Sequence, residues 1–265
     1  MSRPLARVMG ILNVTPDSFS DGGLWARPER ALRRAVEMAE AGADIIDVGG
    51  ESTRPGSRPV SVDEELDRVV PVIEAIAAST GVTVSVDTSK PEVMVAAVRA
   101  GAGMINDVCA LQQPGALETA AGLNVPVCLM HMKGQPRDMQ EQPEYEDVVG
   151  EVEAFLAERA EACMAAGIPA DRIAIDPGFG FGKTLEHNRE LFRNLRRLCG
   201  SGYPVLVGVS RKSMLGTFTG RSVDERLAGS LAAAVLAAQA GAAILRVHDV
   251  AETVDALKVA EALQA

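Results

Sequence analysis

The stretch TVSVDTSKPEVMVAAVRAGAGMINDV, residues 83–108, decides the fold. It holds two short runs rich in Val and Ile, at 83–88 and 104–108. Between them lies a segment of helical pattern that opens at Pro91 and stops at Gly101, and glycine is the common residue just past a helix end. Runs of this kind are expected for parallel strands buried on both faces. The stretch therefore predicts a strand–helix–strand unit.

The same unit recurs along the whole chain. Six further runs rich in apolar residues are ARVMGILNV (6–14), DIIDVGG (44–50), PVCLMH (126–131), RIAIDPG (172–178), PVLVGVS (204–210) and AILRVHD (243–249). Amphipathic segments alternate with them, and several of these stop at a glycine: Gly42, Gly81, Gly101, Gly167 and Gly241. The segment 62–80 has helical spacing, although Pro71 interrupts it and can kink it.

Eight alternating β and α units predict an α/β fold of the (β/α)8 TIM barrel type. The length of 265 residues suits one such barrel, and we predict a single domain over residues 1–265. A doubly wound open sheet is the alternative, but the G-x-G-x-x-G fingerprint is missing after the first run.

Composition excludes several classes of protein. The net charge is −10 and there is no run of Lys and Arg, which argues against a nucleic-acid binder. The four cysteines are widely spaced without a C-x-x-C pair, so we expect free thiols in a reducing cytoplasm. The apolar run 227–245 is Ala-rich and contains Gln239, which favours a buried helix and a strand over a membrane span. No signal-type segment opens the chain.

The stretch DPGFGFGKT, residues 176–184, looks like a phosphate-binding P-loop but misses the motif by one residue. Pro177 stands where the first glycine is needed, and proline has no N–H to offer a phosphate. In a barrel, this stretch is the loop that leaves the sixth strand. We therefore interpret it as a pocket wall whose glycines keep side chains out of the pocket floor, with Lys183 as a solvated lysine at a helix start.

Polar residues gather where the predicted strands end, and in a barrel these ends and the following loops surround one mouth. They are Asn13, Asp47, Glu51, Asp87, Asn106, Asp107, His131, Asp176, Ser210, Arg211, Lys212, Arg246, His248 and Asp249. Asp87, Asn106 and Asp176 suit a flat heterocycle with adjacent N–H and amino groups, because a carboxylate accepts two parallel hydrogen bonds. Lys212, Arg246 and His248 suit a phosphate or pyrophosphate.

Some of these residues also have purely structural interpretations. Asp47 can be a charge inside the barrel that is paired with a neighbour, and we give it little weight as a catalytic group. Asp87 taken alone can cap the helix that opens at Pro91. His131 reads as a hydrogen-bonded histidine at a strand end rather than as a ligand.

Several motifs together resemble the dihydropteroate synthase family. They are MGILNVTPDSFSDGG (9–23), DVGGESTRPG (47–56), SVDTSKPEV (85–93), INDV (105–108), IDPGFGFGKT (175–184), GVSRKSMLG (208–216) and RVHDV (246–250). The resemblance implies a homodimeric TIM barrel of the folate pathway that sulfonamides inhibit. Its implied reaction joins 6-hydroxymethyl-7,8-dihydropterin pyrophosphate to p-aminobenzoate and releases pyrophosphate, with Mg2+ as cofactor.

The resemblance also implies a role for individual residues. The pterin site comprises Asp87, Asn106, Val108, Met130, Asp176, Phe181 and Lys212. The pyrophosphate site comprises Asn13, Arg246 and His248, with Asn13 as the Mg2+ contact. The p-aminobenzoate site comprises Phe19, Thr53, Arg54, Pro55, Phe181 and Ser213. Catalysis falls to Asp87, Lys212, Arg246 and His248.

Two rival functions share part of this site. A pterin-binding methyltransferase domain would use Asp87, Asn106 and Asp176, but would need neither the cationic residues nor the STRPG loop. A catalytically silent pterin-binding homologue would be favoured by loss of Asn13, Arg54 or Lys212, and all three are present. For the homodimer, we expect the contact on the Ala-rich helix at 223–241 and its neighbours, because small residues permit close approach.

Overall fold

The computed structural model describes residues 5–15, 27–52, 57–134, 139 and 143–264. Its strands are β1 (Arg7–Asn13), β2 (Ile45–Gly49), β3 (Thr83–Asp87), β4 (Met104–Asp107), β5 (Val127–Met130), β6 (Ile173–Asp176), β7 (Leu206–Val207) and β8 (Ile244–Val247). They form one parallel sheet in the order β6-β5-β4-β3-β2-β1-β8-β7. A parallel bridge between Ile175 and Val205 joins its two edges, which closes the barrel. The predicted TIM barrel is confirmed.

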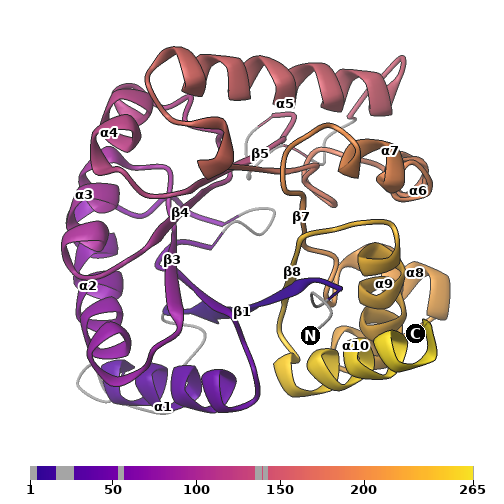
Figure 1. The fold of residues 1–265 in the computed structure, drawn as a ribbon, viewed down its shortest axis with the longest axis horizontal. Coiled ribbons are helices and arrows are strands. Elements are labelled where there is room, and N and C mark those ends of the chain that lie inside the picture. The colour runs from indigo at the N-terminus through magenta and orange to yellow at the C-terminus, as the bar shows by residue number, and fades with distance from the viewer. Residues whose placement is uncertain (1–4, 16–26, 53–56, 135–138, 140–142, 265) are drawn as a thin grey trace.

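Helices surround the barrel on the outside (Figure 1). They are α1 (Arg27–Glu40), α2 (Val62–Ser79), α3 (Pro91–Arg99), α4 (Ala116–Leu123), α5 (Val148–Ala165), α6 (Leu185–Arg193), α7 (Leu195–Cys199), α8 (Ser213–Thr219), α9 (Leu227–Gln239) and α10 (Val250–Gln264), with 3-10 turns η3 (Ala170–Arg172) and η4 (Val223–Glu225). No described helix is both long enough and apolar enough to cross a membrane.

Helix ends follow the predicted signals with two differences. Gly42, Gly101, Gly167 and Gly241 adopt positive φ after their helices, as glycine stop signals do, whereas Gly81 does not. Helix α2 continues through Pro71, which lies on its exposed face. The Ala-rich helix begins at Leu227 rather than near residue 223, because η4 precedes it.

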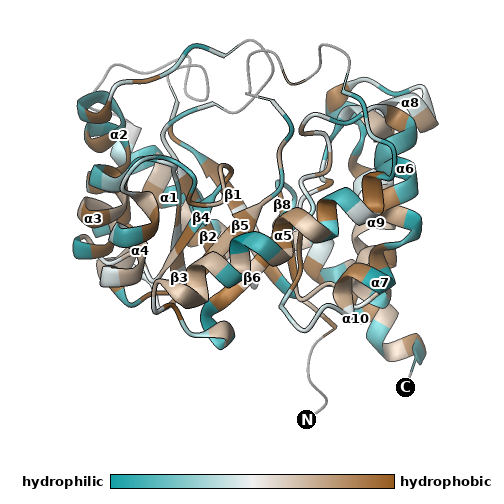
Figure 2. Ribbon diagram, turned by 90° about the horizontal axis from the view of Figure 1, so that it is seen from above, coloured by the Kyte–Doolittle hydropathy of each residue, from teal (hydrophilic) through white to brown (hydrophobic). Residues whose placement is uncertain are grey.

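Two apolar layers hold the barrel together, and Figure 2 shows the hydrophobic strands between the outer helices. A small cluster joins residues from seven strands: Met9, Ile45, Met104, Cys128, Ala174, Leu206 and Ile244. A larger cluster joins the other faces of the strands to the helices, for example Ile46 with Val69 and Ile73. Because side chains alternate along a strand, β2 gives Ile46 and Val48 to the larger cluster and directs Ile45 and Asp47 to the opposite face.

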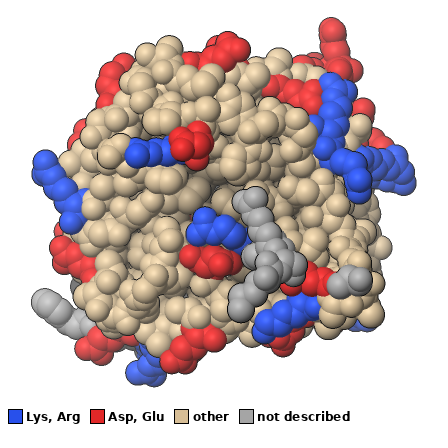
Figure 3. Space-filling view, viewed as in Figure 1, with Lys and Arg blue, Asp and Glu red and all other residues tan. Residues whose placement is uncertain are grey.

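Charges on the surface are mixed. On the face drawn in Figure 3, acidic and basic side chains lie among wide uncharged areas, and a group of basic side chains at the upper right adjoins acidic ones.

Candidate active site

The carboxyl ends of the strands bring the predicted polar residues to one mouth. Asn13, Asp87 and Asp176 are the last residues of β1, β3 and β6. Asn106 pairs in register with Asp87, and Met130 pairs with Asp176. Asp87, Asn106, Met130 and Asp176 are all at least nine-tenths buried. The chain therefore places carboxylates, an amide and an apolar side chain in a sheltered ring at the barrel mouth.

Arg246 on β8 reaches across the barrel to two carboxylates. Its Nε donates to Asp47 Oδ2 at 2.7 Å, and its Nη2 donates to Asp87 Oδ2 at 2.7 Å. Burial raises the pKa of Asp87 to about 7, with Arg246 opposing this shift and Asp47 adding to it. Burial works against the charge of Arg246, but Asp47 and Asp87 outweigh it, so the pKa of Arg246 is raised. One guanidinium thus serves two carboxylates.

Lys212 approaches the ring from the loop after β7. Its Nζ donates to the Phe179 carbonyl and lies 4.6 Å from the centroid of the Phe181 ring. Burial lowers the pKa of Lys212 to about 8, although Asp176 acts in the opposite direction. Burial raises the pKa of Asp176, whose Oδ1 accepts a hydrogen bond from the Gly178 N–H at 2.7 Å. This side of the mouth offers a cation, an acceptor and an aromatic face together.

His248 follows β8 and is oriented by Ser210. The His248 backbone N–H donates to Ser210 Oγ at 3.2 Å, and the same hydroxyl lies 3.0 Å from His248 Nδ1. A hydroxyl that accepts from the backbone can give its own proton to Nδ1, which favours the tautomer with a proton on Nε2. An Nε2–H donor suits an anionic ligand.

Asn13 and Asp87 face a common space above Gly49. A Cβ placed on Gly49 would lie 3.6 Å from Asn13 Oδ1 and 3.6 Å from Asp87 Oδ2. A Cβ at position 49 would make only ordinary van der Waals contact with these two oxygen atoms. Oxygen ligands are the kind that Mg2+ prefers.

The interpretation of residues 176–184 as a loop at the pocket is supported, but Lys183 is not a solvated lysine. It is 3% exposed, and its Nζ lies 2.9 Å from His131 Nδ1 and 3.0 Å from the carbonyl oxygens of Gly178 and Phe181. Burial lowers the pKa of Lys183 to about 7. The Lys183 Nζ is thus directed at carbonyls of its own loop and at His131, in contrast to the phosphate contact of a P-loop lysine.

The glycines of this loop allow its backbone to lie close to the backbone after β5, rather than keeping side chains out of a pocket floor as predicted. A Cβ on Gly178 would lie 1.9 Å from the His131 carbonyl oxygen, and one on Gly182 would lie 2.1 Å from that of Lys133. Both glycines also have positive φ, at 67° and 61°. The loop therefore packs backbone to backbone against the segment after β5. His131 is buried, as expected for a hydrogen-bonded strand-end residue.

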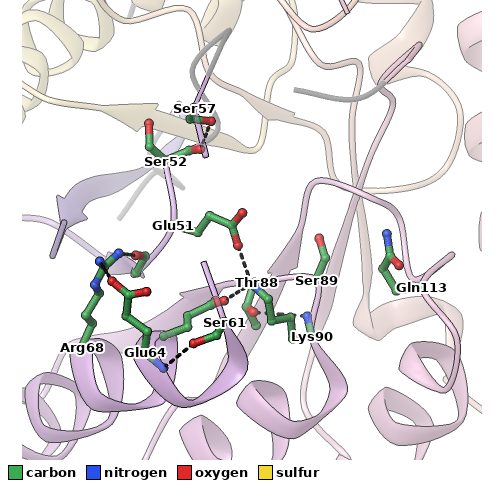
Figure 4. A network of polar contacts seen from close by, with 12 residues as sticks. Glu51, Ser52, Ser57, Ser61, Glu64, Arg68, Thr88, Ser89, Lys90 and Gln113 are labelled. Carbon is green, nitrogen blue, oxygen red and sulfur yellow. Dashed lines mark hydrogen bonds and ion pairs between the residues drawn. The ribbon is translucent and has the colours of Figure 1, made fainter. Parts of the chain in front are cut away.

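A cavity of about 520 Å3 opens beside Asp87, Val108 and Met130. Its outer wall contains a charged network that the sequence analysis missed (Figure 4). Lys90, just before α3, forms ion pairs with Glu51 after β2 and with Glu65 on α2. Glu65 is 1% exposed and shares the buried side of α2 with Val69, Val72, Ile73 and Ile76. A glutamate on an apolar helix stripe was the available sequence signal.

The start of the loop after β2 is held by this network and by α2. Arg68 Nη1 donates to the Gly50 carbonyl at 2.7 Å, and Ser57 Oγ donates to the Ser52 carbonyl (Figure 4). The predicted residues Thr53, Arg54, Pro55 and Phe19 lie outside the described residues. Of the other residues assigned to p-aminobenzoate, Phe181 is half-buried at the mouth and Ser213 is exposed at the start of α8.

This barrel mouth is that of a pterin-binding enzyme. Residues 9–248 match the family model described as pterin binding enzyme. The chain is 56% identical over 255 residues to dihydropteroate synthase of Escherichia coli strain K12, covering 96% of this chain and 90% of that protein. The chain belongs to the dihydropteroate synthase family, a family of transferases.

Solved structures agree over the full fold. The structure of Xanthomonas albilineans dihydropteroate synthase with 4-aminobenzoic acid has a TM-score of 0.94 and 59% identity, covering 98% of this chain and 93% of that chain. The structure of the enzyme from the same organism in complex with 7,8-dihydropteroate has a TM-score of 0.89 and 56% identity, covering 98% and 94% of the two chains.

Proposed function

We propose that this chain condenses 6-hydroxymethyl-7,8-dihydropterin pyrophosphate with p-aminobenzoate to give 7,8-dihydropteroate and pyrophosphate. The observation that carries the proposal is the convergence of Asp87, Asn106 and Asp176 with Lys212 and Arg246 at one mouth. Family membership supports the same reaction. The rival methyltransferase does not require the cationic group at this mouth.

Asp176 and Asn106 hold the pterin ring in this proposal. A buried carboxylate matches the adjacent N–H and amino group of a pterin, and Asp176 is 6% exposed. Met130 and Val108 line the cavity beside Asp87, and in this proposal they pack against the flat faces of the ring. Lys212 donates to the ring from the side where it already contacts the Phe179 carbonyl.

Arg246, His248 and Asn13 hold the pyrophosphate. Arg246 remains charged at any working pH because its pKa is raised, and the Nε2–H of His248 adds a second donor. Asn13 Oδ1, facing the space above Gly49, would hold Mg2+ together with pyrophosphate oxygens. The ion would supply neutralisation of charge on the leaving group. No three His, Cys, Asp or Glu side chains of the described residues cluster as a metal site.

The chemical step breaks the bond between the pterin methylene carbon and the pyrophosphate oxygen. The electron pair of that bond leaves with pyrophosphate, and Arg246 and His248 stabilise the growing negative charge. The lone pair of the arylamine forms the new carbon–nitrogen bond, after which the nitrogen releases a proton. Because an arylamine is mostly unprotonated near neutral pH, the enzyme needs no strong base. Ionised Asp87 stabilises positive charge that develops on the pterin, which favours an SN1-like path.

Phe181 and Ser213 contact p-aminobenzoate, together with Phe19, Thr53, Arg54 and Pro55. The long segments 15–29 and 51–61 complete this second site after pyrophosphate binds, so binding is ordered with the pterin first. Equilibrium binding of p-aminobenzoate at unchanged affinity without pyrophosphate and Mg2+ would contradict the order.

The test of function measures both products. The purified chain is incubated with Mg2+, the dihydropterin pyrophosphate and p-aminobenzoate, and dihydropteroate and pyrophosphate are assayed together. We expect equal amounts of both, and we expect Asp87→Ala and Arg246→Ala each to lower the rate by at least about a hundredfold. Pterin binding by calorimetry without any condensation product would overturn the proposal and direct attention to methyl transfer or to a silent pterin-binding role.

The same proposal includes a homodimer that works in the cytoplasm. Leu236 on α9 is 55% exposed, and Val259 and Leu263 on α10 are 59% and 83% exposed. Val259 and Leu263 line a shallow groove between α9 and α10, and Leu236 adds exposed apolar surface on α9 outside that groove. These side chains support this face as the contact between two copies. All four cysteines are free thiols, as expected for a cytoplasmic protein.

A further inference from the structure

Asp47 lies one layer below the ring of substrate residues. It stands two positions before Gly49 on β2, and Gly49 pairs in register with Asp87 on β3. Side chains two apart on a strand point the same way, so Asp47 points into the barrel beneath the mouth. Asp47 is fully buried, at 0% exposure, so its side chain does not reach the solvent-filled space of the mouth where a substrate would bind.

One oxygen of Asp47 joins the two halves of the site. Asp47 Oδ2 accepts from Arg246 Nε at 2.7 Å and from Asn106 Nδ2 at 3.0 Å. Asn106 belongs to the pterin side of the mouth, and Arg246 belongs to the pyrophosphate side. A single buried carboxylate oxygen therefore sets the position of one group in each half.

We propose that Asp47 is a positioning residue that fixes the Asn106 amide and the Arg246 guanidinium relative to each other. This inference rests on the proposed function of those two residues. A carboxylate only accepts hydrogen bonds, so it holds the amide with Nδ2 directed downward and Oδ1 directed away from Asp47. Arg246 gives Nε to Asp47 and Nη2 to Asp87, and its Nη1 has no hydrogen-bond partner among the described residues.

A purely structural role for Asp47 explains less of this arrangement. A carboxylate that only neutralised Arg246 would need no bond to Asn106, since Asp87 already pairs with that guanidinium. Asp47 Oδ1 has no hydrogen-bond partner although it is buried, which is a cost that an apolar residue would avoid. Retaining a costly carboxylate under two substrate groups is the pattern expected when orientation, rather than stability, is the benefit.

The test compares Asp47→Asn with a control variant at Asp44, the residue just before the same strand. Asp44 lies just before β2 and accepts from the Val8 N–H at 2.8 Å, so Asp44→Asn removes one carboxylate without touching the site. For Asp47→Asn we expect kcat/KM for the pterin substrate, and affinity for 6-hydroxymethylpterin by calorimetry, each to fall by at least about tenfold. Asp44→Asn is expected to leave both within about twofold.

A double-mutant cycle separates positioning from stability. If Asp47 acts through Asn106, the pair Asp47→Asn with Asn106→Ala should lose little more pterin affinity than Asn106→Ala alone. Unchanged pterin affinity and kcat/KM in a folded Asp47→Asn variant, or full additivity in the cycle, would overturn the proposal.

Should Asp47→Asn not fold, Asp47→Glu keeps the charge and moves the carboxylate by one methylene group. Positioning predicts a folded Asp47→Glu protein with a lowered kcat, and normal kinetics from this variant would refute it. The two proposals fail differently. If the wild-type chain makes no dihydropteroate, the proposed function is wrong, whereas an active wild type with an unaffected Asp47 variant removes only the role of Asp47.

Discussion

At the scale of single residues, Lys183 gives a pH dependence of stability whose sign is fixed. Burial lowers its pKa from the ordinary 10.5 to about 7 in the folded protein. Between these values the unfolded chain binds a proton that the folded chain does not, so the free energy of unfolding rises with pH through this window. We expect the free energy of unfolding of the wild type, relative to that of Lys183→Met, to rise by about 2 kcal/mol between pH 7 and pH 9, measured by urea unfolding.

Lys133→Met is the matched control, because Lys133 lies in the segment after the neighbouring strand β5 and its side chain is 46% exposed. Its stability difference from wild type should be flat over the same pH range. A Lys183→Met curve parallel to that of wild type would show that Lys183 keeps its proton in the folded state.

Single residues are also where the sequence is least informative. Lys183 follows three glycines that alternate with Pro and Phe at the start of a helix, a position that usually holds a solvated lysine. Its burial depends on His131, which is 52 residues away along the chain. Asp47 was correctly taken as a paired charge inside the barrel, yet its bond to Asn106 on β4 follows only from closure of the sheet. Partners from distant strands cannot be assigned from spacing.

At the scale of elements, Lys90 links the segment after β2 to α2 and α3. Removing its ammonium leaves Glu65, which is 1% exposed, without a cation. Breaking a buried ion pair from one side costs about 3–5 kcal/mol. We therefore expect Lys90→Met to lower the free energy of unfolding by about 3 kcal/mol, as measured by urea denaturation.

Lys258→Met is the control at the same scale, because Lys258 pairs with Asp255 on α10 and both side chains are more than two-thirds exposed. Exposed pairs contribute about 0–1 kcal/mol. A Lys90→Met variant as stable as Lys258→Met would mean that Glu65 becomes protonated or hydrated at little cost. The variant Lys90→Arg, which keeps a cation, should recover part of the loss.

The strands could be predicted from the sequence because each one lies in a local run of apolar residues. Each of the eight apolar runs contains a strand, because strands that lie between helices on one side and the barrel interior on the other must be apolar on both faces. The run at 204–210 yields only Leu206–Val207 as β7, since Gly208 and the turn into Arg211 at positive φ end the ladder early. Charged positions such as Lys90 were missed because a lysine beside a helix start looks solvated in sequence.

At the scale of the whole molecule, the strict alternation of strands and helices was sufficient to predict the fold. Parallel neighbours joined by right-handed crossovers leave two edges, and eight units bring these edges together at Ile175 and Val205. The mouth follows from the same rule, since every strand end points one way. The assembly state does not follow from this rule, because nothing in a barrel pattern says which outer helix faces a second copy.

The dimer proposal makes the last prediction at this scale. Leu236 and Val259 are more than half exposed on neighbouring helices, and burying them between two copies would remove apolar surface from water. We expect the wild type to sediment as a dimer, and Leu236→Glu and Val259→Glu to sediment as folded monomers, since a charge at the centre of an apolar contact is desolvated without a partner. Met164→Glu on α5, where Met164 is 39% exposed, should remain dimeric. A wild type that stays monomeric at about 50 µM, above the dissociation constants of stable dimers, would contradict the dimer proposal.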